Sequence, residues 1–400
     1  MAQGTSRKGV HCFHGARNPW LRRMKVRVSC GAIGILASAF SITWAAELDV
    51  AGYGRVYDRT YEMYEREYAK LVASGLGESY YAFQYVIEAT LSMFEATRER
   101  IYLERALAWS EVMVSKANVL DDNGNWNWRG GWKPAFAPAP IAYQLEDFQG
   151  STGLARLCQI VLKDAELTTA YGRRVAGIFQ FVKNDIVDKH LYRRGSEKYL
   201  LAGARDRGKV LDDKVVLLIR CMLPIYSLGV SGYRETIYDL ASGFRSRLTP
   251  YKGGLIWDRG LGYGMDSALD TSHANRYPDA ALDLYKAGVA FSLEDIKGMA
   301  ALFTKVIWNQ SLEDPRFANF IDGSNGRYRG YQPWAGGLIY FGWVKLGEMD
   351  SRVQQVAAAT LTAMVDGKRN PSIDSMNSIY GRLALTGHLA RNASVQPMSR

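Results

Sequence analysis

The stretch that decides the fold runs from residue 53 to residue 73 and reads YGRVYDRTYEMYEREYAKLVA. It places five tyrosines close to one helical turn apart, at Tyr53, Tyr57, Tyr61, Tyr64 and Tyr68. Spacings of three and four residues put these rings on one face of an α-helix. The pattern therefore predicts an amphipathic helix that packs its tyrosine face against a core.

The rest of the chain repeats this kind of pattern. Apolar periodicity predicts further helices at 79–97 (with Ser79 as N-cap), 101–117, 138–149, 151–164, 168–189, 209–228, 232–247, 279–288, 292–308, 334–347, 350–366 and 374–390. Strand-like alternation is scarce, and residues 253–258 are the best candidate.

Successive helices with short connections pair into hairpins, and stacked hairpins form an open solenoid or a closed ring. A weak internal sequence similarity between YLERALAW at 102–109 and YRETIYDL at 233–240 indicates repetition. No strict period of roughly 34 or 40 residues supports an open repeat array. We therefore expect an all-α single domain over 46–400, an (α/α) toroid or incomplete barrel of about six to seven helical hairpins.

The first 45 residues have a composition of their own. A basic segment at 22–27 precedes an apolar stretch at 31–42 and small residues at 43–46. This order is typical of a signal peptide, with Met24 as the start, and the apolar run is short for a membrane span of about 20 residues. The leader predicts export to the periplasm or beyond.

The formal net charge of +10 comes mostly from this leader. Seven basic residues and no acid lie in residues 1–45, which leaves +3 for the rest of the chain. No later basic run or nucleic-acid motif is present, so a nucleic-acid partner is not expected. The 10 Trp, 24 Tyr and 14 Phe favour a carbohydrate partner, because sugar rings stack on aromatic faces, although aromatic residues also fill cores.

Cysteine usage does not define a metal site. Cys158 and Cys221 follow the leader, and they form either one disulfide or two buried thiols. No Cys/His cluster has metal-ligand spacing, and the Asp121-Asp122-Asn123 segment lacks the downstream glutamate of a calcium loop. We expect no metal and no cofactor.

The segment DTSHANRYP at 270–278 is the densest set of chemically useful side chains. It combines the candidate base His273 with Asp270, Asn275, Arg276 and Tyr277. These supply an orienting carboxylate, an amide, a cation and a phenol, which chemistry on acidic sugars requires. The alternative is a helix start with a structural histidine. His190 and His388, the other two histidines after the leader, are expected to be structural.

Two loops are expected to join the segment 270–278 in lining a substrate-binding cleft. The first, DDNGNWNWRGGW at 121–132, is expected to form a sugar platform with Trp126, Asn127, Trp128 and Arg129, unless it is a packed loop between helices.

The second loop, DGSNGRYRGYQPW at 322–334, puts Arg327, Tyr328, Arg329 and Tyr331 close together and ends at Trp334, a further candidate for substrate binding. Its alternative is a turn with solvated arginines.

The exported helical chain, the Trp-rich loop, the Ser-His-Ala-Asn-Arg segment and the Asn-Gly-Arg-Tyr-Arg-Gly-Tyr loop resemble the (α/α)-toroid polysaccharide lyases that act on alginate or glucuronan. The resemblance covers residues 50–390 in architecture and only these loops in motif. It implies β-elimination on a uronate polysaccharide, with His273 as base or charge neutraliser and Arg327 or Arg329 on the carboxylate.

The same resemblance implies Tyr331 or Tyr277 as the acid and Asn127 or Asn275 as the amide. The chain departs from the lyase pattern, because such lyases carry an inward-facing Asn or Gln before the histidine. Residues 186–274 contain neither residue type, and the corresponding helix begins with Asp212 and Asp213.

This departure keeps a rival open, an inverting glycoside hydrolase on the same toroid. Such an enzyme needs two carboxyl groups roughly 6.5–9.5 Å apart. The candidates are Asp213, Asp266, Asp270, Glu88 and Asp322. The alternative role for each of them is that of an ordinary helix-capping or surface acid. A third possibility from another class is a non-catalytic glycan-binding protein of an exopolysaccharide system, which would keep the aromatics without needing His273.

Overall fold

The computed structural model describes residues 48–121, 124–130, 144–192, 213–257, 268–326 and 332–395. The leader with its predicted signal peptide lies outside the described residues, and so do Asp266, Arg327, Arg329 and Tyr331.

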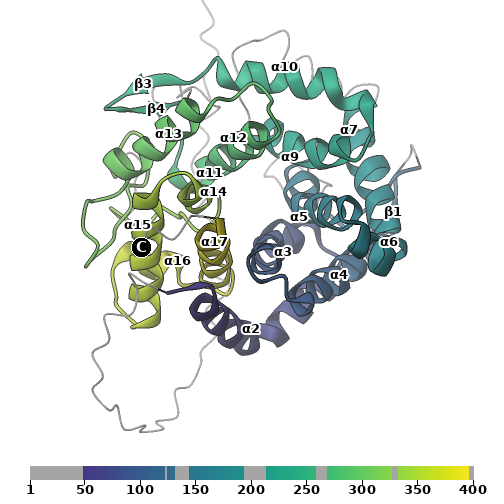
Figure 1. Ribbon diagram of the computed structural model, residues 1–400, viewed down its shortest axis with the longest axis horizontal. Helices are drawn as coiled ribbons and strands as arrows, with labels where there is room; N and C mark the ends of the chain where they lie inside the picture. Colours follow the sequence, from purple (N-terminus) through teal and green to yellow (C-terminus); the bar gives the residue numbers. More distant parts are fainter. Residues whose placement is uncertain are drawn as a thin grey trace, which may run out of the picture. The chain divides into compact units, whose positions relative to one another are not determined.

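Six helices form an inner ring in which each contacts the next (Figure 1). In ring order they are α3 (Gly77–Thr97), α5 (Gln144–Lys163), α9 (Asp213–Ser227), α12 (Arg276–Lys286), α14 (Gly342–Lys345) and α17 (Gly381–Val395), and α17 returns to α3. This arrangement confirms the predicted all-α toroid.

An outer layer surrounds this ring. Its longer helices are α2 (Val50–Ala73), α4 (Arg100–Ser115), α6 (Ala165–Gln180), α10 (Arg234–Arg245), α13 (Leu293–Leu302) and α15 (Ser351–Val365). Shorter turns complete it: η1 (Phe181–Asp188), α7 (Lys189–Tyr192), η2 (Ser231–Tyr233), α11 (Thr271–Ala274), η3 (Phe303–Ile307), η4 (Leu346–Glu348) and α16 (Pro371–Met376).

Helix α2 has the predicted amphipathic form. Asp49 caps its N-terminus, accepting a hydrogen bond from the Gly52 amide at 2.7 Å. Tyr57 and Tyr68 are fully buried, and the Tyr68 hydroxyl donates to the Ile379 carbonyl at 2.5 Å. The tyrosine face thereby ties the first outer helix to the segment that leads into α17.

One predicted helix break is wrong. Residues 144–163 form the single helix α5, where separate helices were expected on either side of Gly150. A Cβ at Gly150 would lie 2.9 Å from the Trp128 ring, and one at Gly153 would lie 2.8 Å from Ile87. These glycines allow close packing and do not end the helix.

Sheet is confined, in the described residues, to two short antiparallel hairpins. Strand β1 (Val119–Leu120) pairs with β2 (Trp126–Asn127), and β3 (Thr249–Tyr251) pairs with β4 (Gly254–Ile256). The second confirms the predicted strand. No helix in the described part of the chain is long and apolar enough to span a bilayer.

The two cysteines of the domain are free thiols, which resolves the alternative left open by the sequence. Cys158 and Cys221 are fully buried, and burial raises the pKa of both thiols. They act as small apolar core residues.

Candidate functional site

The first two turns of four inner helices meet at one end of the ring. We call this end the mouth and define it by Tyr81, Gln149, Asp213 and Arg276. Arg276 is 2% exposed and joins the other three. Its Nε donates to Gln149 Oε1 at 2.7 Å, its Nη1 to Asp213 Oδ2 at 2.6 Å, and its Nη2 to the Tyr81 hydroxyl.

The electrostatics of the mouth depend on this arginine. Burial opposes the charge of Arg276, but the neighbouring Tyr81 and Asp213 raise its pKa, so the guanidinium stays charged. Its ion-pair partner Asp213 has 19% of its side chain exposed, and the pair favours the carboxylate form of that residue. The mouth therefore contains one fixed carboxylate that solvent can reach.

His273 and Asp270 form a dyad beside the mouth. Asp270 caps helix α11, accepting the His273 amide at 3.0 Å on Oδ1 and contacting His273 Nδ1 at 2.7 Å on Oδ2. The Asp270 carboxylate raises the pKa of His273, and Arg276 and Asp213 are close enough to modify it. The His273 side chain is 39% exposed, so it is the accessible member of the dyad.

Helix α3 presents a row of polar side chains to the mouth. Glu78, Tyr81 and Tyr85 stand three and four residues apart on one face. The Tyr85 hydroxyl accepts a hydrogen bond from Gln149 Nε2 at 2.8 Å. Glu78 is half-buried with no hydrogen bond or ion pair to any residue in the described segments, and burial raises its pKa.

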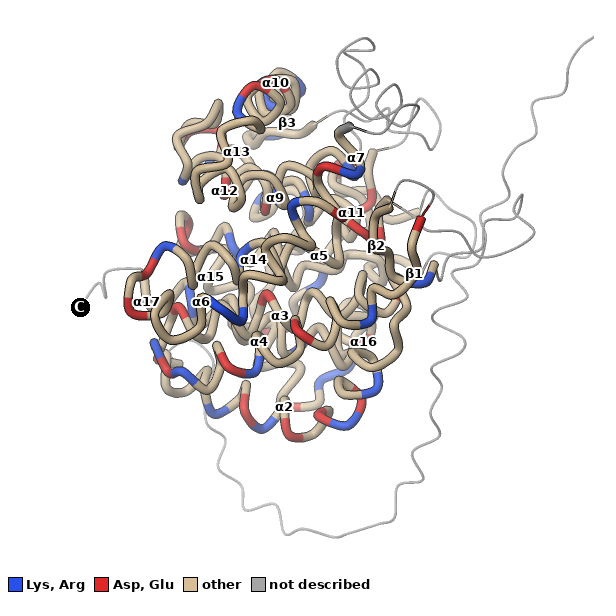
Figure 2. The backbone as a smooth tube through the Cα atoms, turned by 90° about the vertical axis from the view of Figure 1, so that its right-hand side faces the viewer, with Lys and Arg blue, Asp and Glu red and all other residues tan. Residues whose placement is uncertain are grey.

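The hairpin β1–β2 lies at the same end of the ring, where it contacts η1 and α7 (Figure 2). Trp126 is 47% exposed, and its amide donates to Asp185 Oδ1 at 2.8 Å. Asn127 is buried, and its Oδ1 accepts a hydrogen bond from Lys189 Nζ at 2.5 Å. The exposed ring of this predicted platform is therefore Trp126.

Three residues predicted to contact substrate lie in the core instead. Trp128 is 2% exposed and donates to the Met113 carbonyl, and Tyr277 is fully buried and stacked on Trp257. Asn275 is fully buried and donates to the Leu338 carbonyl. Burial therefore excludes all three from the cleft.

Two candidate acids are likewise structural. Glu88 is 2% exposed and pairs with Arg220 at 2.8 Å, farther along α3. Asp322 accepts from the Ser324 amide and hydroxyl and stabilises a turn. Of the five predicted acids, the structure brings Asp213 and Asp270 to the mouth.

Two predicted contacts, Arg129 and Trp334, form no hydrogen bond within the described segments to the four residues that define the mouth. Arg129 is exposed and donates to the Ser74 carbonyl, and Trp334 is half-buried. His190 is buried against Asp147 at 2.8 Å, and His388 is buried against Ser92. Both histidines are buried away from the mouth, and among the described residues His190 contacts only Asp147 through its Nε2.

Sequence reasoning missed Glu78, Tyr81 and Gln149. The helix containing Glu78 was predicted to begin at Ser79, but it begins at Gly77. An acid in a first helical turn is also the ordinary response to the helix dipole, so it carries no functional signal. Tyr81 lies 195 residues before Arg276, and no local pattern reveals that contact.

No protein-family model matches the chain, and no curated protein matches it. Among solved structures it is similar to an inactive variant of the α-1,6-mannanase GH76A of Salegentibacter sp. HEL1_6, in complex with α-1,6-mannotetrose. In that variant two consecutive aspartates are replaced by alanine. Sequence identity is 13%, the match covers 86% of this chain and 99% of that one, and the TM-score is 0.51.

A second similar structure is the Lin0763 protein of Listeria innocua, at 14% identity and a TM-score of 0.46. That match covers 79% of this chain and 84% of the other. At these identities the mannanase likeness shows the (α/α) toroid fold and nothing finer.

Proposed function

We propose that the chain is a glycoside hydrolase that cleaves a glycan bound at the mouth. The observation that carries this proposal is a pair of carboxyl groups in opposite environments. Asp213 forms an ion pair with Arg276 at 2.6 Å, whereas burial raises the pKa of Glu78, which has no partner among the described residues. Glycosidases need one ionised and one protonated carboxyl group on either side of the scissile bond.

The chemistry follows from these two environments. In its protonated form Glu78 donates its proton to the glycosidic oxygen as the bond from that oxygen to the anomeric carbon breaks. Asp213 takes a proton from a water whose oxygen forms the new bond to the anomeric carbon. The two groups then exchange protons with solvent, and atoms and charge balance over the cycle. A water between them makes the reaction inverting.

Surrounding side chains support a glycan substrate. The exposed ring of Trp126 offers a stacking surface, and the mannanase with the similar fold binds an α-1,6-linked mannose tetrasaccharide. The dyad of His273 and Asp270 favours an imidazolium beside the mouth, which suits an acidic substituent on the sugar. Export by the leader would bring the enzyme to an extracellular polysaccharide.

Digestion of a panel of acidic and neutral polysaccharides tests this function. A hydrolase yields fragments heavier by one water per cut, with new reducing ends and no ultraviolet absorbance from an unsaturated uronate. Asp213→Asn should abolish turnover and retain glycan binding. Binding without turnover by the wild-type chain across the panel would instead indicate a non-catalytic glycan-binding protein.

A uronate lyase is the second candidate, and one cluster favours it. Arg276 lies between the Tyr81 hydroxyl and the region of His273, which supplies a base, a phenol and a cation in one place. A lyase product is lighter than the hydrolase product by one water and absorbs in the ultraviolet. The fold comparison favours the hydrolase, since the similar structure is a hydrolase.

A further inference from the structure

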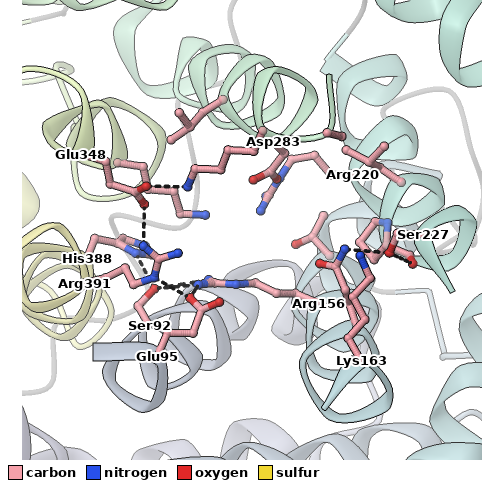
Figure 3. A pocket seen from close by; sticks show the side chains of 18 of the residues that line it. Ser92, Glu95, Arg156, Lys163, Arg220, Ser227, Asp283, Glu348, His388 and Arg391 are labelled. Atoms are coloured by element: carbon pink, nitrogen blue, oxygen red, sulfur yellow. Dashed lines mark hydrogen bonds and ion pairs between the residues drawn. The ribbon is translucent and has the colours of Figure 1, made fainter. Parts of the chain in front are cut away.

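The end of the ring opposite the mouth holds a cavity of about 230 Å³. Its walls come from the second halves of α3, α5, α9, α12 and α17, together with α14 and η4 (Figure 3). This volume lies below the roughly 300 Å³ at which drug-sized pockets begin. The cavity therefore suits a molecule of monosaccharide size and not a polymer, and the chemistry proposed for the mouth does not use it.

A network of buried ion pairs lies next to this cavity. Glu88 pairs with Arg220 at 2.8 Å, Arg156 at 2.7 Å and Lys345 at 3.2 Å. Asp279 pairs with Arg220 at 2.8 Å and Lys345 at 2.7 Å. These contacts connect five of the six inner helices, so the charged groups are fixed in place before any ligand arrives.

Cations outnumber carboxylates around the cavity by one. The six cations that line it are Arg156, Lys163, Arg220, Lys286, Lys345 and Arg391. The five carboxylates paired with them are Glu88, Glu95, Asp279, Asp283 and Glu348. Helix carboxyl ends favour cations here. Lys163, exposed at the rim, has no carboxylate partner within the described segments.

His388 contributes an unused hydrogen-bond donor to the cavity wall. Ser92 Oγ accepts from Arg156 at 3.2 Å, and we assign its own proton to the hydrogen bond with His388 Nδ1 at 3.0 Å. Burial and nearby cations lower the pKa of His388, so the ring is neutral and its proton is on Nε2. His388 is 1% exposed, and this Nε2 has no partner in the described protein.

Asn392, one turn further along α17, contributes an unused acceptor. Its Nδ2 donates to the Val344 carbonyl and to Gln354 Oε1, both at 2.8 Å, which fixes the orientation of the amide. Its Oδ1 is buried without a partner among the described residues. Buried polar groups are rarely left unpaired, and a hydroxyl can accept from one group and donate to the other.

We propose that this cavity binds a small hydroxylated carboxylate, with the chemistry of an aldonic or uronic monosaccharide. One hydroxyl of the ligand pairs with His388 Nε2 and Asn392 Oδ1. The carboxylate lies toward Lys163 at the rim. Apolar contacts from Leu223 and Leu282 cover the carbon skeleton.

Titration calorimetry on the full chain tests this site with gluconate, glucose, acetate and sulfate as probes. Gluconate should bind with a Kd on the order of 1 mM, about tenfold more tightly than glucose, and acetate and sulfate should give no saturable heat. Lys163→Met should weaken gluconate about tenfold and leave glucose unchanged. The matched control Lys297→Met, an exposed lysine on α13, should bind gluconate like the wild type.

Three results would overturn the proposal. If no probe binds at about 100 mM, which is about 100 times the expected Kd, water alone fills the cavity. If acetate or sulfate matches gluconate, the site is a general anion site and the hydroxyl assignment is wrong. If Lys163→Met behaves like Lys297→Met, the carboxylate does not lie at the rim. None of these readouts depends on activity at the mouth.

Discussion

Glu78 is the side chain on which the proposed chemistry depends most. Its carboxyl group is half-buried without a described partner, and burial raises its pKa. Glu78→Gln removes the acidic proton and keeps the shape, so turnover should fall at least about 100-fold, a typical contribution of general acid catalysis. The melting temperature should stay within a few degrees. Glu62→Gln, on the exposed face of α2, is the control and should keep full activity.

The dyad of His273 and Asp270 makes a prediction about pH. The folded-state pKa of His273 is raised by Asp270, so its stabilisation is complete below the unfolded value of about 6.5. It is lost as the pH rises through the higher folded value. The stability difference between wild type and His273→Asn, measured by urea unfolding, should therefore shrink from pH 6 to pH 9. A difference that is constant or grows over this range would contradict the dyad.

At the scale of elements, close helix packing decides where glycine is required. A Cβ at Gly387 on α17 would collide with the Ala89 carbonyl on α3, whereas a Cβ at Gly177 on α6 meets nothing within 4 Å. Gly387→Ala should lower the free energy of unfolding by about 1–3 kcal/mol. Gly177→Ala should be neutral or stabilising by about 0.5–1 kcal/mol. Equal effects in urea unfolding would refute the tight contact between α3 and α17.

Helix periodicity predicted most elements correctly. It was wrong for residues 334–341, which form turns and not a helix, and for residues 377–380, which separate α16 from α17. The unexpected continuity of α5 has a physical cause. Gly150 looks like a helix breaker in the sequence, but it lies inside α5, where the Trp128 ring approaches the backbone. That approach is a tertiary contact and leaves no local signal. The same reason explains Trp128, predicted as a sugar platform from its Trp-rich loop and found in the core.

At the scale of the whole molecule, helical pairing predicted the toroid but not the composition of its mouth. Arg276 was expected to contact substrate, whereas it joins Tyr81, Gln149 and Asp213 from three other helices. Those residues are separated by 63 to 195 positions along the chain. The ring brings them together, so their roles follow from its closure and not from any motif.

The contribution of the Arg276–Asp213 ion pair to the closed ring can be measured as a free energy of unfolding. Arg276→Met removes the ion pair between Arg276 and Asp213 and should lower the free energy of unfolding by about 3–5 kcal/mol. Adding Asp213→Asn removes the charge that faced Arg276 and should restore part of that loss. If the double variant is no more stable than Arg276→Met in urea unfolding, the pair does not hold the mouth together.

Cleavage in heavy-oxygen water tests the central claim most directly. Mass spectrometry of the fragments should find one heavy oxygen per cut at the new reducing end, and Glu78→Gln should abolish that incorporation. Fragments that lack the heavy oxygen and are lighter by one water would contradict hydrolysis and establish β-elimination at the same mouth.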